Sequence, residues 1–199
     1  MTLKKYGKTY SSYGIKNLSV KFHKDNDIET TKFGCVGSLE DEMETRTITK
    51  KCEGIVAKSV TRGTGHGTIK ISAHINYDVF VRVYGMYFED LAVGVYAYGQ
   101  DSKHEEFTLT GEVLDEDDIK KFVAYPNCVV SSGVATKIEN GAEEVAEVEL
   151  EIEVFPDEHK RGKYEALEAL LEDENIKSKW MTNFNYDLVK AAGSAVTAA

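Results

Sequence analysis

Residues 143–154 carry the clearest pattern of the chain, EEVAEVELEIEV, in which glutamates alternate with apolar residues from Ala146 onward. Successive side chains of a strand point to opposite faces, so the pattern predicts a strand with one apolar face and one face of carboxylates. The carboxylate face would hold Glu147, Glu149, Glu151 and Glu153. Glutamate is a poor strand former and like charges on one face repel, so this face is either an ordinary solvated surface or one selected for function.

Similar alternation predicts further strands along the chain. The expected strands cover residues 18–22, 53–61, 69–75, 92–98, 107–113, 119–130 and 134–138. Asn140-Gly141 lies between the last of these and the glutamate strand, and this dipeptide between alternating runs indicates a hairpin. The acidic cluster Asp115 to Asp118 separates two strand runs and is expected to form their turn.

Helices are expected to be few. Residues 77–84 follow Asn76, a good N-cap, and precede Gly85, a good residue for ending a helix. Residues 163–174 carry Tyr164, Leu167 and Leu170 at helical spacing and predict a second helix. Residues 36–52 have no clean apolar period and many charges, which predicts a long charged loop or projecting hairpin and makes this segment a candidate interaction element.

Length and composition agree with a single, mainly β (α+β) domain. The chain has 199 residues, of which 42% are hydrophobic and only two are proline, enough for one well-buried core. We expect the domain to span residues 1–190, with an N-terminal arm at about 1–16. Residues 191–199 lack large side chains and are expected to form a flexible C-terminal tail.

Charge narrows the classes of partner. A formal charge of −10 argues against binding nucleic acid through its phosphates, which requires clustered lysine and arginine. No segment approaches the ~18 apolar residues of a membrane span, and the N-terminus lacks the apolar run of a signal peptide, so cytoplasmic synthesis without membrane association is expected. The three cysteines, Cys35, Cys52 and Cys128, form no CxxC pair and are expected to be reduced thiols.

The search for catalytic chemistry predicts no active site. The run Gly63 to Gly67 resembles a phosphate-binding loop but leads into a strand instead of a helix, so a flexible turn between strands is expected. His66 and His74 have no third metal ligand at a supportive spacing, and Asp115 to Asp118 lacks the pattern of an EF-hand. GxSxG and HExxH are absent from the sequence, so we expect neither an enzyme nor a cofactor.

A series of short motifs then identifies a family resemblance. In order they are GCVGSLE at residues 34–40, KCEG at 51–54, GHGTIKISAH at 65–74, VYGM at 83–86, YAYG at 96–99, AYPNC at 124–128 and ENGAEEVAE at 139–147. Over residues 30–190 the chain resembles the major tail proteins (tail tube proteins) of long-tailed, siphovirus-type phages and prophages of Gram-positive bacteria. The resemblance implies a β-sandwich or barrel-like fold with one or two flanking helices and a long projecting loop.

The same resemblance implies a structural virion protein, made in the host cytoplasm, whose stacked and commonly hexameric rings form a tube for DNA passage. The implied partners are other copies of the chain and the tape measure, tail terminator and distal tail proteins. Tubes of contractile tails and of secretion systems share this general plan and remain alternatives. A monomeric β-barrel that binds a small ligand is a further alternative, although such a cavity should be mostly apolar.

Two hypotheses about sites follow from the sequence. Glu147, Glu149, Glu151 and Glu153 would line the lumen, where an acidic surface prevents DNA phosphates from adhering; alternatively they lie on the outside of the tube and keep it soluble. The segment 36–52 would make the contacts between successive rings. Its proposed contact residues are Leu39, Glu40, Asp41, Glu42, Met43, Glu44 and Arg46.

Overall fold

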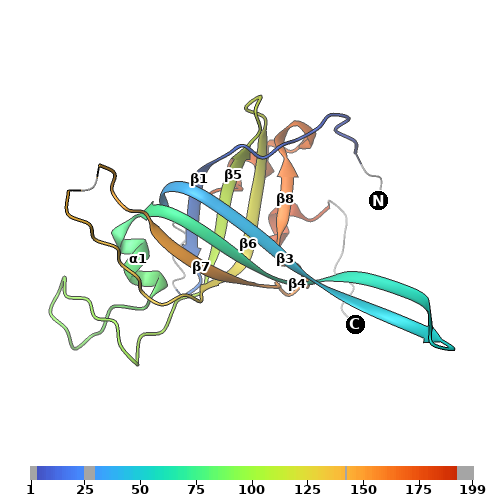
Figure 1. The fold of residues 1–199 in the computed structure, drawn as a ribbon. Coiled ribbons are helices and arrows are strands. Elements are labelled where there is room, and N and C mark those ends of the chain that lie inside the picture. The colour runs from blue at the N-terminus through green and yellow to red at the C-terminus, as the bar shows by residue number, and fades with distance from the viewer. Residues whose placement is uncertain (1–3, 25–29, 142, 192–199) are drawn as a thin grey trace.

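The computed structural model of the protein describes residues 4–24, 30–141 and 143–191 (Figure 1). The strands are β1 Gly14–Phe22, β2 Thr31–Lys32, β3 Gly34–Cys52, β4 Ile55–Ile75, β5 Phe107–Leu114, β6 Lys120–Val130, β7 Val148–Phe155 and β8 Tyr164–Leu167. The helices are α1 Tyr77–Val83, the 3-10 helix η1 Glu168–Leu170, α2 Glu174–Lys179 and α3 Tyr186–Val189. The prediction of a mainly β chain is confirmed.

All strands belong to one antiparallel sheet with the order β2-β1-β5-β6-β7-β4-β3, in which β8 also pairs with β6. The sheet curls until its two ends meet near Phe33, whose amide donates to the Leu18 carbonyl and whose carbonyl accepts from the Asn76 amide. Phe33 connects β2, which pairs with β1, directly to β3 at the opposite end of the sheet. The fold is therefore barrel-like at this end.

The main hydrophobic core fills the inside of the curled sheet. It takes apolar side chains from β1, β4, β5, β6 and β7, and α1 adds Val79, Val83 and Tyr84. The predicted helix at 77–84 is confirmed: the Asn76 side chain accepts from the Asp78 amide, and Gly85 has a φ of +58°. The predicted turn at Asp115 is also confirmed, since its carboxylate accepts from the amides of Asp117 and Ile119.

A second, smaller core lies on the other face of the sheet. Phe122 and Ala124 of β6 pack there against Trp180 and Phe184 from the C-terminal segment. The Trp180 indole N–H donates to the Val123 carbonyl over 3.1 Å and so fixes this segment to the sheet. Residues 192–199, which cover most of the predicted flexible tail, lie outside the described residues, as do residues 1–3 of the predicted N-terminal arm.

The segment 36–52 is a strand. It pairs with β4 to form a hairpin whose turn is at Glu53 and Gly54. The distal part of this hairpin projects from the body (Figure 1), so of the two predictions, a long loop or a projecting hairpin, the hairpin is confirmed. The predicted turn at Gly63 to Gly67 is wrong, because these residues continue β4. Two of the glycines allow close approach of other backbone: a side chain at Gly67 would collide with the backbone of Glu42, and one at Gly65 would crowd the Lys160 carbonyl.

Two predicted strands are absent from the described part of the chain. Residues 92–98 and 134–138 form loops, and the expected hairpin at Asn140-Gly141 is only a turn. Alternation shows that a segment could form a strand, but it does not show whether a neighbouring strand is available to pair with it. β7 finds its partners in β4 and β6, which leaves residues 134–138 unpaired with it.

The predicted helix at 163–174 is wrong as well. Residues 164–167 form β8 against β6, only the short 3-10 helix η1 follows it, and an α-helix begins at Glu174, capped by Asp173. Tyr164 and Ala166 pack against the second core, so burial against the sheet outweighs the helical spacing of the leucines.

We predict that Trp180→Ala lowers the free energy of unfolding by about 3–5 kcal/mol, since it removes a large side chain that is 2% exposed and leaves a cavity. Trp180→Phe keeps most of the packing and loses the hydrogen bond, for a cost of about 1 kcal/mol. Urea unfolding followed by circular dichroism measures both. A loss below about 1 kcal/mol for the alanine variant would show that the second core does not stabilise the fold.

Candidate functional site

The predicted glutamate strand is confirmed as β7, and pairing places its carboxylates on a larger acidic surface. Residues directly opposite one another in a sheet share a face, and three rows run from β3 through β4 to β7. The rows are Ser38–Ser72–Glu149, Glu40–Lys70–Glu151 and Glu42–Thr68–Glu153. The opposite face of the same strands carries Ile69, Ile71, Leu150 and Ile152 in the main core.

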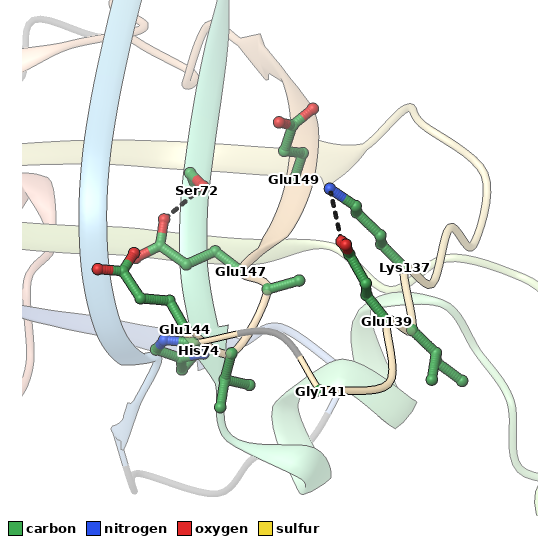
Figure 2. Close-up of a pocket in the computed structure, with 11 residues that line it drawn as sticks. Ser72, His74, Lys137, Glu139, Gly141, Glu144, Glu147 and Glu149 are labelled. Carbon is green, nitrogen blue, oxygen red and sulfur yellow. Dashed lines mark hydrogen bonds and ion pairs between the residues drawn. The ribbon is translucent and has the colours of Figure 1, made fainter.

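Glu147 joins this surface from the loop before β7. Its carboxylate accepts a 2.6 Å hydrogen bond from the Ser72 hydroxyl (Figure 2). It lies over Gly37 of β3, where any side chain would collide with the carboxylate. Glu147 thus extends across β4 towards β3, whereas the other three glutamates project from β7 itself.

We call this surface the acidic face: glutamates 40, 42, 147, 149, 151 and 153, together with Ser38, Thr68, Lys70 and Ser72. The six glutamates are exposed, and six carboxylates against one lysine give a formal charge of −5. Lys70 lies between Glu40 and Glu151 in the middle row, which partly offsets repulsion among its neighbours. The face is a strongly negative surface supported from behind by a packed core.

A pocket beside the acidic face lies under the loop that precedes β7. His74, Lys137, Glu139, Glu144 and Glu147 contribute to its wall (Figure 2). Lys137 pairs with Glu139 over 3.8 Å within the loop. No group of three His, Cys, Asp or Glu side chains among the described residues could hold a metal ion. The pocket therefore offers a surface on which glutamates outnumber lysine.

The proposed contact residues of the segment 36–52 do not form a loop, and the structure divides them. Glu40 and Glu42 belong to the acidic face. Leu39 and Met43 point the other way and pack against the main core. Asp41 also points inward and bonds Lys163 over 2.5 Å. Glu44 is exposed where the register of β3 and β4 shifts, and only Arg46 lies on the projecting part of the hairpin.

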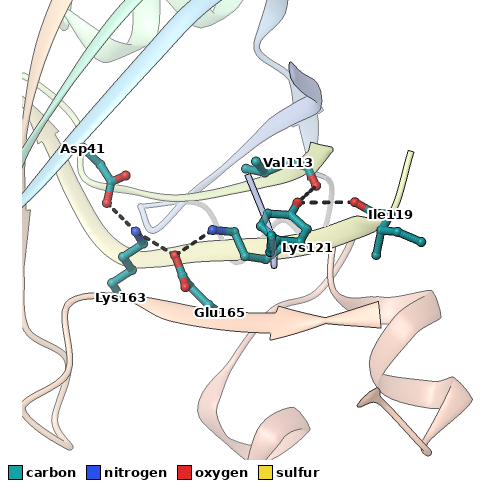
Figure 3. Close-up of polar contacts among 7 residues, drawn as sticks. Asp41, Val113, Ile119, Lys121, Lys163 and Glu165 are labelled. Carbon is teal, nitrogen blue, oxygen red and sulfur yellow. Dashed lines mark hydrogen bonds and ion pairs between the residues drawn. The ribbon is translucent and has the colours of Figure 1, made fainter. Parts of the chain in front are cut away.

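Asp41 belongs to a network that connects β3, β6 and β8 (Figure 3). Lys163 bonds both Asp41 and Glu165, and Glu165 also pairs with Lys121 over 3.5 Å. Partial burial alone would lower the pKa of Lys163, but its bonds to the two carboxylates raise it above its ordinary value. Partial burial alone would raise the pKa of Glu165, but the Lys163 and Lys121 ammonium groups lower it below its ordinary value. Both charges are therefore held at neutral pH, and the network is structural.

The N-terminal segment is attached beside this network. The Tyr10 hydroxyl donates to the Val113 and Ile119 carbonyls, and the Lys121 ammonium lies 5.1 Å from its ring centre. Burial and nearby carboxylates raise the pKa of Tyr10 to about 12, so its hydroxyl remains a donor at neutral pH. At least this part of the predicted N-terminal arm lies against the body of its own subunit.

The distal hairpin, residues 46–62, is a second candidate surface, which we call the arm. Cross-strand pairing gives it one face with the pairs Arg46–Arg62, Ile48–Val60 and Lys50–Lys58, and another with Thr47–Thr61 and Thr49–Ser59. Five lysines and arginines against Glu53 alone give the arm a formal charge of +4, in a chain whose total is −10. The sequence alone did not pair Lys50 with Lys58 or Arg46 with Arg62, because the register shifts between Lys50 and Lys51 and moves these pairs by one residue from a simple count outward from the turn.

All three cysteines are free thiols; Cys35 and Cys52 are exposed and Cys128 is buried. Within the described ranges, no helix is long and apolar enough to cross a membrane.

Comparison with known proteins gives similarity of structure only. No family model and no curated protein sequence matches the chain. A chain in the cryo-EM structure of the anti-feeding prophage baseplate is similar with a TM-score of 0.42 and 10% identity, covering 78% of this chain and 97% of that one. A chain of the anti-feeding prophage cap, which terminates the tube, is similar with a TM-score of 0.37 and 9% identity, covering 80% and 95%.

Proposed function

We propose that the protein is a structural subunit of a phage tail tube, in which copies assemble into stacked rings and the acidic face lines the DNA channel. The observation that carries the proposal is the acidic face itself, six exposed glutamates from β3, β7 and the loop before β7, with a single lysine of β4 among them. Duplex DNA is a dense polyanion, so such a lining would repel phosphates and let DNA pass without adhering. The sequence resemblance to tail tube proteins supports the same function.

The edge of the sheet supports assembly through strand pairing. β3 is 19 residues long and, among the described strands, pairs only with β4, on one side. Long edge strands offer backbone groups to another chain and are usually shortened or covered when a protein remains monomeric. A neighbouring copy that pairs with this edge would extend the acidic face from subunit to subunit.

The alternative of a monomeric ligand-binding barrel has less support. The interior of the curled sheet is filled by large side chains, among them Phe33, Phe107, Tyr125 and Ile152, each at most 1% exposed. Ligand sites of barrels are mostly apolar cavities, whereas the pocket beside the acidic face is rimmed by glutamates.

Charge reversal tests the channel assignment. We predict that Glu149→Lys combined with Glu151→Lys leaves assembly and particle shape unchanged, because both side chains are exposed. DNA delivery by the particles should fall at least about tenfold, since lysines would bind phosphates. Glu116→Lys with Asp117→Lys, at the β5–β6 turn, is the matched control with the same charge change. Titres of assembled particles measure the effect, and normal delivery by the Glu149 and Glu151 variant would contradict a lumen position.

Removal of the arm tests its role in assembly. Thr45 pairs with Gly63, so an Asn-Gly turn can replace residues 46–62 and join β3 to β4 in register. Because the arm contributes nothing to the two cores, the free energy of unfolding should change by less than about 1 kcal/mol. The concentration needed for polymerisation, measured by light scattering and negative-stain microscopy, should rise at least about tenfold. Normal polymerisation of this folded variant would exclude the arm from the contacts between copies.

A further inference from the structure

The arm exposes apolar side chains and like-charge pairs that no other described part of its own subunit covers. Residues 44–59 and 61–63 are exposed, so both strands of the ribbon lack a core. Two like-charge pairs, Arg46–Arg62 and Lys50–Lys58, lie directly across from each other, and such pairs are destabilising. Ile48 between them is 54% exposed, and Ile55 and Val56 near the tip are 74% and 54% exposed. A two-stranded ribbon of this kind is marginal in water unless it packs against another surface.

The complementary surface lies on the loop after α1. Residues 86–101 contain Glu89, Asp90 and Asp101 and no lysine or arginine, a formal charge of −3. The same loop exposes five large apolar side chains, and Tyr77 of α1 adds a sixth. They are Tyr77, Tyr87, Val93, Val95, Tyr96 and Tyr98. We call residues 86–101 with Tyr77 the acidic aromatic loop.

Contacts to the body present this loop in a fixed shape. The Tyr77 and Tyr96 rings meet edge to face with centres 5.7 Å apart, and the Ala97 amide donates to the Met86 carbonyl over 2.9 Å. The Tyr87 hydroxyl bonds Glu105, a buried carboxylate that also pairs with Arg82 of α1 over 3.1 Å. A preorganised surface loses little conformational entropy when a partner binds.

The two surfaces lie at opposite ends of the subunit. β4 runs from the tip of the arm at Ile55 to Ile75, two residues before α1, and 21 residues of strand span about 65 Å at ~3.3 Å per residue. Figure 1 shows the arm leaving one end of the sheet and the loop beside α1 at the other. Contact between them within one subunit is therefore excluded, whereas contact between two copies would be head to tail.

We infer that the arm of one copy docks on the acidic aromatic loop of a second copy. The arm brings a charge of +4 and three exposed apolar side chains, and the loop brings −3 and six. The exposed rings of Tyr96 and Tyr98 can also attract lysine and arginine through their π faces, whereas Lys24 of the same subunit already lies over the Tyr87 ring at 5.0 Å. The acidic face fits the arm less well, because its rows of glutamate, serine and threonine offer no apolar surface for Ile48 and Val60.

A head-to-tail contact is heterologous, so it propagates into rings or filaments instead of stopping at a dimer. The inference rests on the proposed function in that it requires copies of the chain to assemble. The inference adds which surface of a second copy binds the arm, and the acidic face and the edge of β3 do not specify that surface.

Site-specific crosslinking tests the contact directly. In a Cys35→Ser background, native Cys52 at the tip of the arm is the one exposed thiol and Cys128 is buried. Val93→Cys, at a fully exposed position of the loop, should then react with Cys52 of another copy through a short bismaleimide. The expected product is a ladder of dimers, trimers and longer chains, because each copy carries one arm and one loop. Ile138→Cys, 84% exposed on a different loop, is the matched control and should give no ladder.

Charge exchange provides a second test. Lys50→Glu with Lys58→Glu, and separately Glu89→Lys with Asp90→Lys, should each raise the concentration needed for polymerisation at least about tenfold. The four substitutions in one chain restore opposite charges and should bring it back to within about threefold of the original protein. If the double variants polymerised poorly because their fold was damaged, combining the four substitutions would not restore polymerisation.

The outcomes separate the two proposals. Rings or tubes that give no ladder with the Val93→Cys variant and no recovery on charge exchange would overturn the receiving surface and leave the proposed function standing. A chain that stays monomeric at every concentration would overturn both. A ladder that stops at the dimer would show an isologous contact and would also overturn the head-to-tail arrangement.

Discussion

The antiparallel pairing of β4 with β7 sets both a side of the main core and the acidic face. Its register sets Ile69 opposite Ile152 and Ile71 opposite Leu150 in the core, and so sets Lys70 opposite Glu151 on the other face. Because side chains alternate with a period of two, a slip by one residue would move the whole row of glutamates inward. Burying several unpaired carboxylates costs far more than the stability of a domain, so the apolar half of β7 fixes the acidic half in place.

The length of β4 connects the functional surfaces of the protein. Its last part, residues 67–75, belongs to the sheet and contributes to the core and to the acidic face. Its first part, residues 55–62, belongs to the arm and has neither a core nor a third strand among the described residues. One continuous strand therefore joins the proposed channel lining to the proposed contact between copies.

Sequence alone predicted the elements whose signals are local. The alternation at 146–154, the Asn76 cap and the Asp115 turn depend on neighbouring residues, and each appears in the structure. The failures depend on partners distant in the chain. Residues 164–167 carry a helical spacing but pair with β6 and pack on Trp180, and residues 134–138 alternate like a strand but find no partner strand in the described part of the chain. The glycines at 63–67 resemble a turn because the close approaches of Gly65 to Lys160 and of Gly67 to Glu42 involve residues distant in the chain.

The sequence predicted only part of the candidate site, because the other residues of the site come from strands distant in the chain. The four glutamates of residues 147–153 are consecutive in their pattern, whereas Glu40, Glu42 and Lys70 join them only through the registers of β3 and β4. The basic face of the arm combines residues on both sides of its turn, so it appears as two unrelated groups of charges when the chain is viewed linearly. The proposed contact residues 39–44 and Arg46 were grouped by proximity in sequence, and strand alternation divides them between core and surface.

A cryo-EM reconstruction of the polymer that the purified protein forms would show directly where the acidic face lies. We expect a hollow tube in which β3, β4 and β7 of each subunit face the axis, with Glu149, Glu151 and Glu153 bordering the lumen. A tube in which this face points outward, or is buried between subunits away from the axis, would contradict the proposed channel lining.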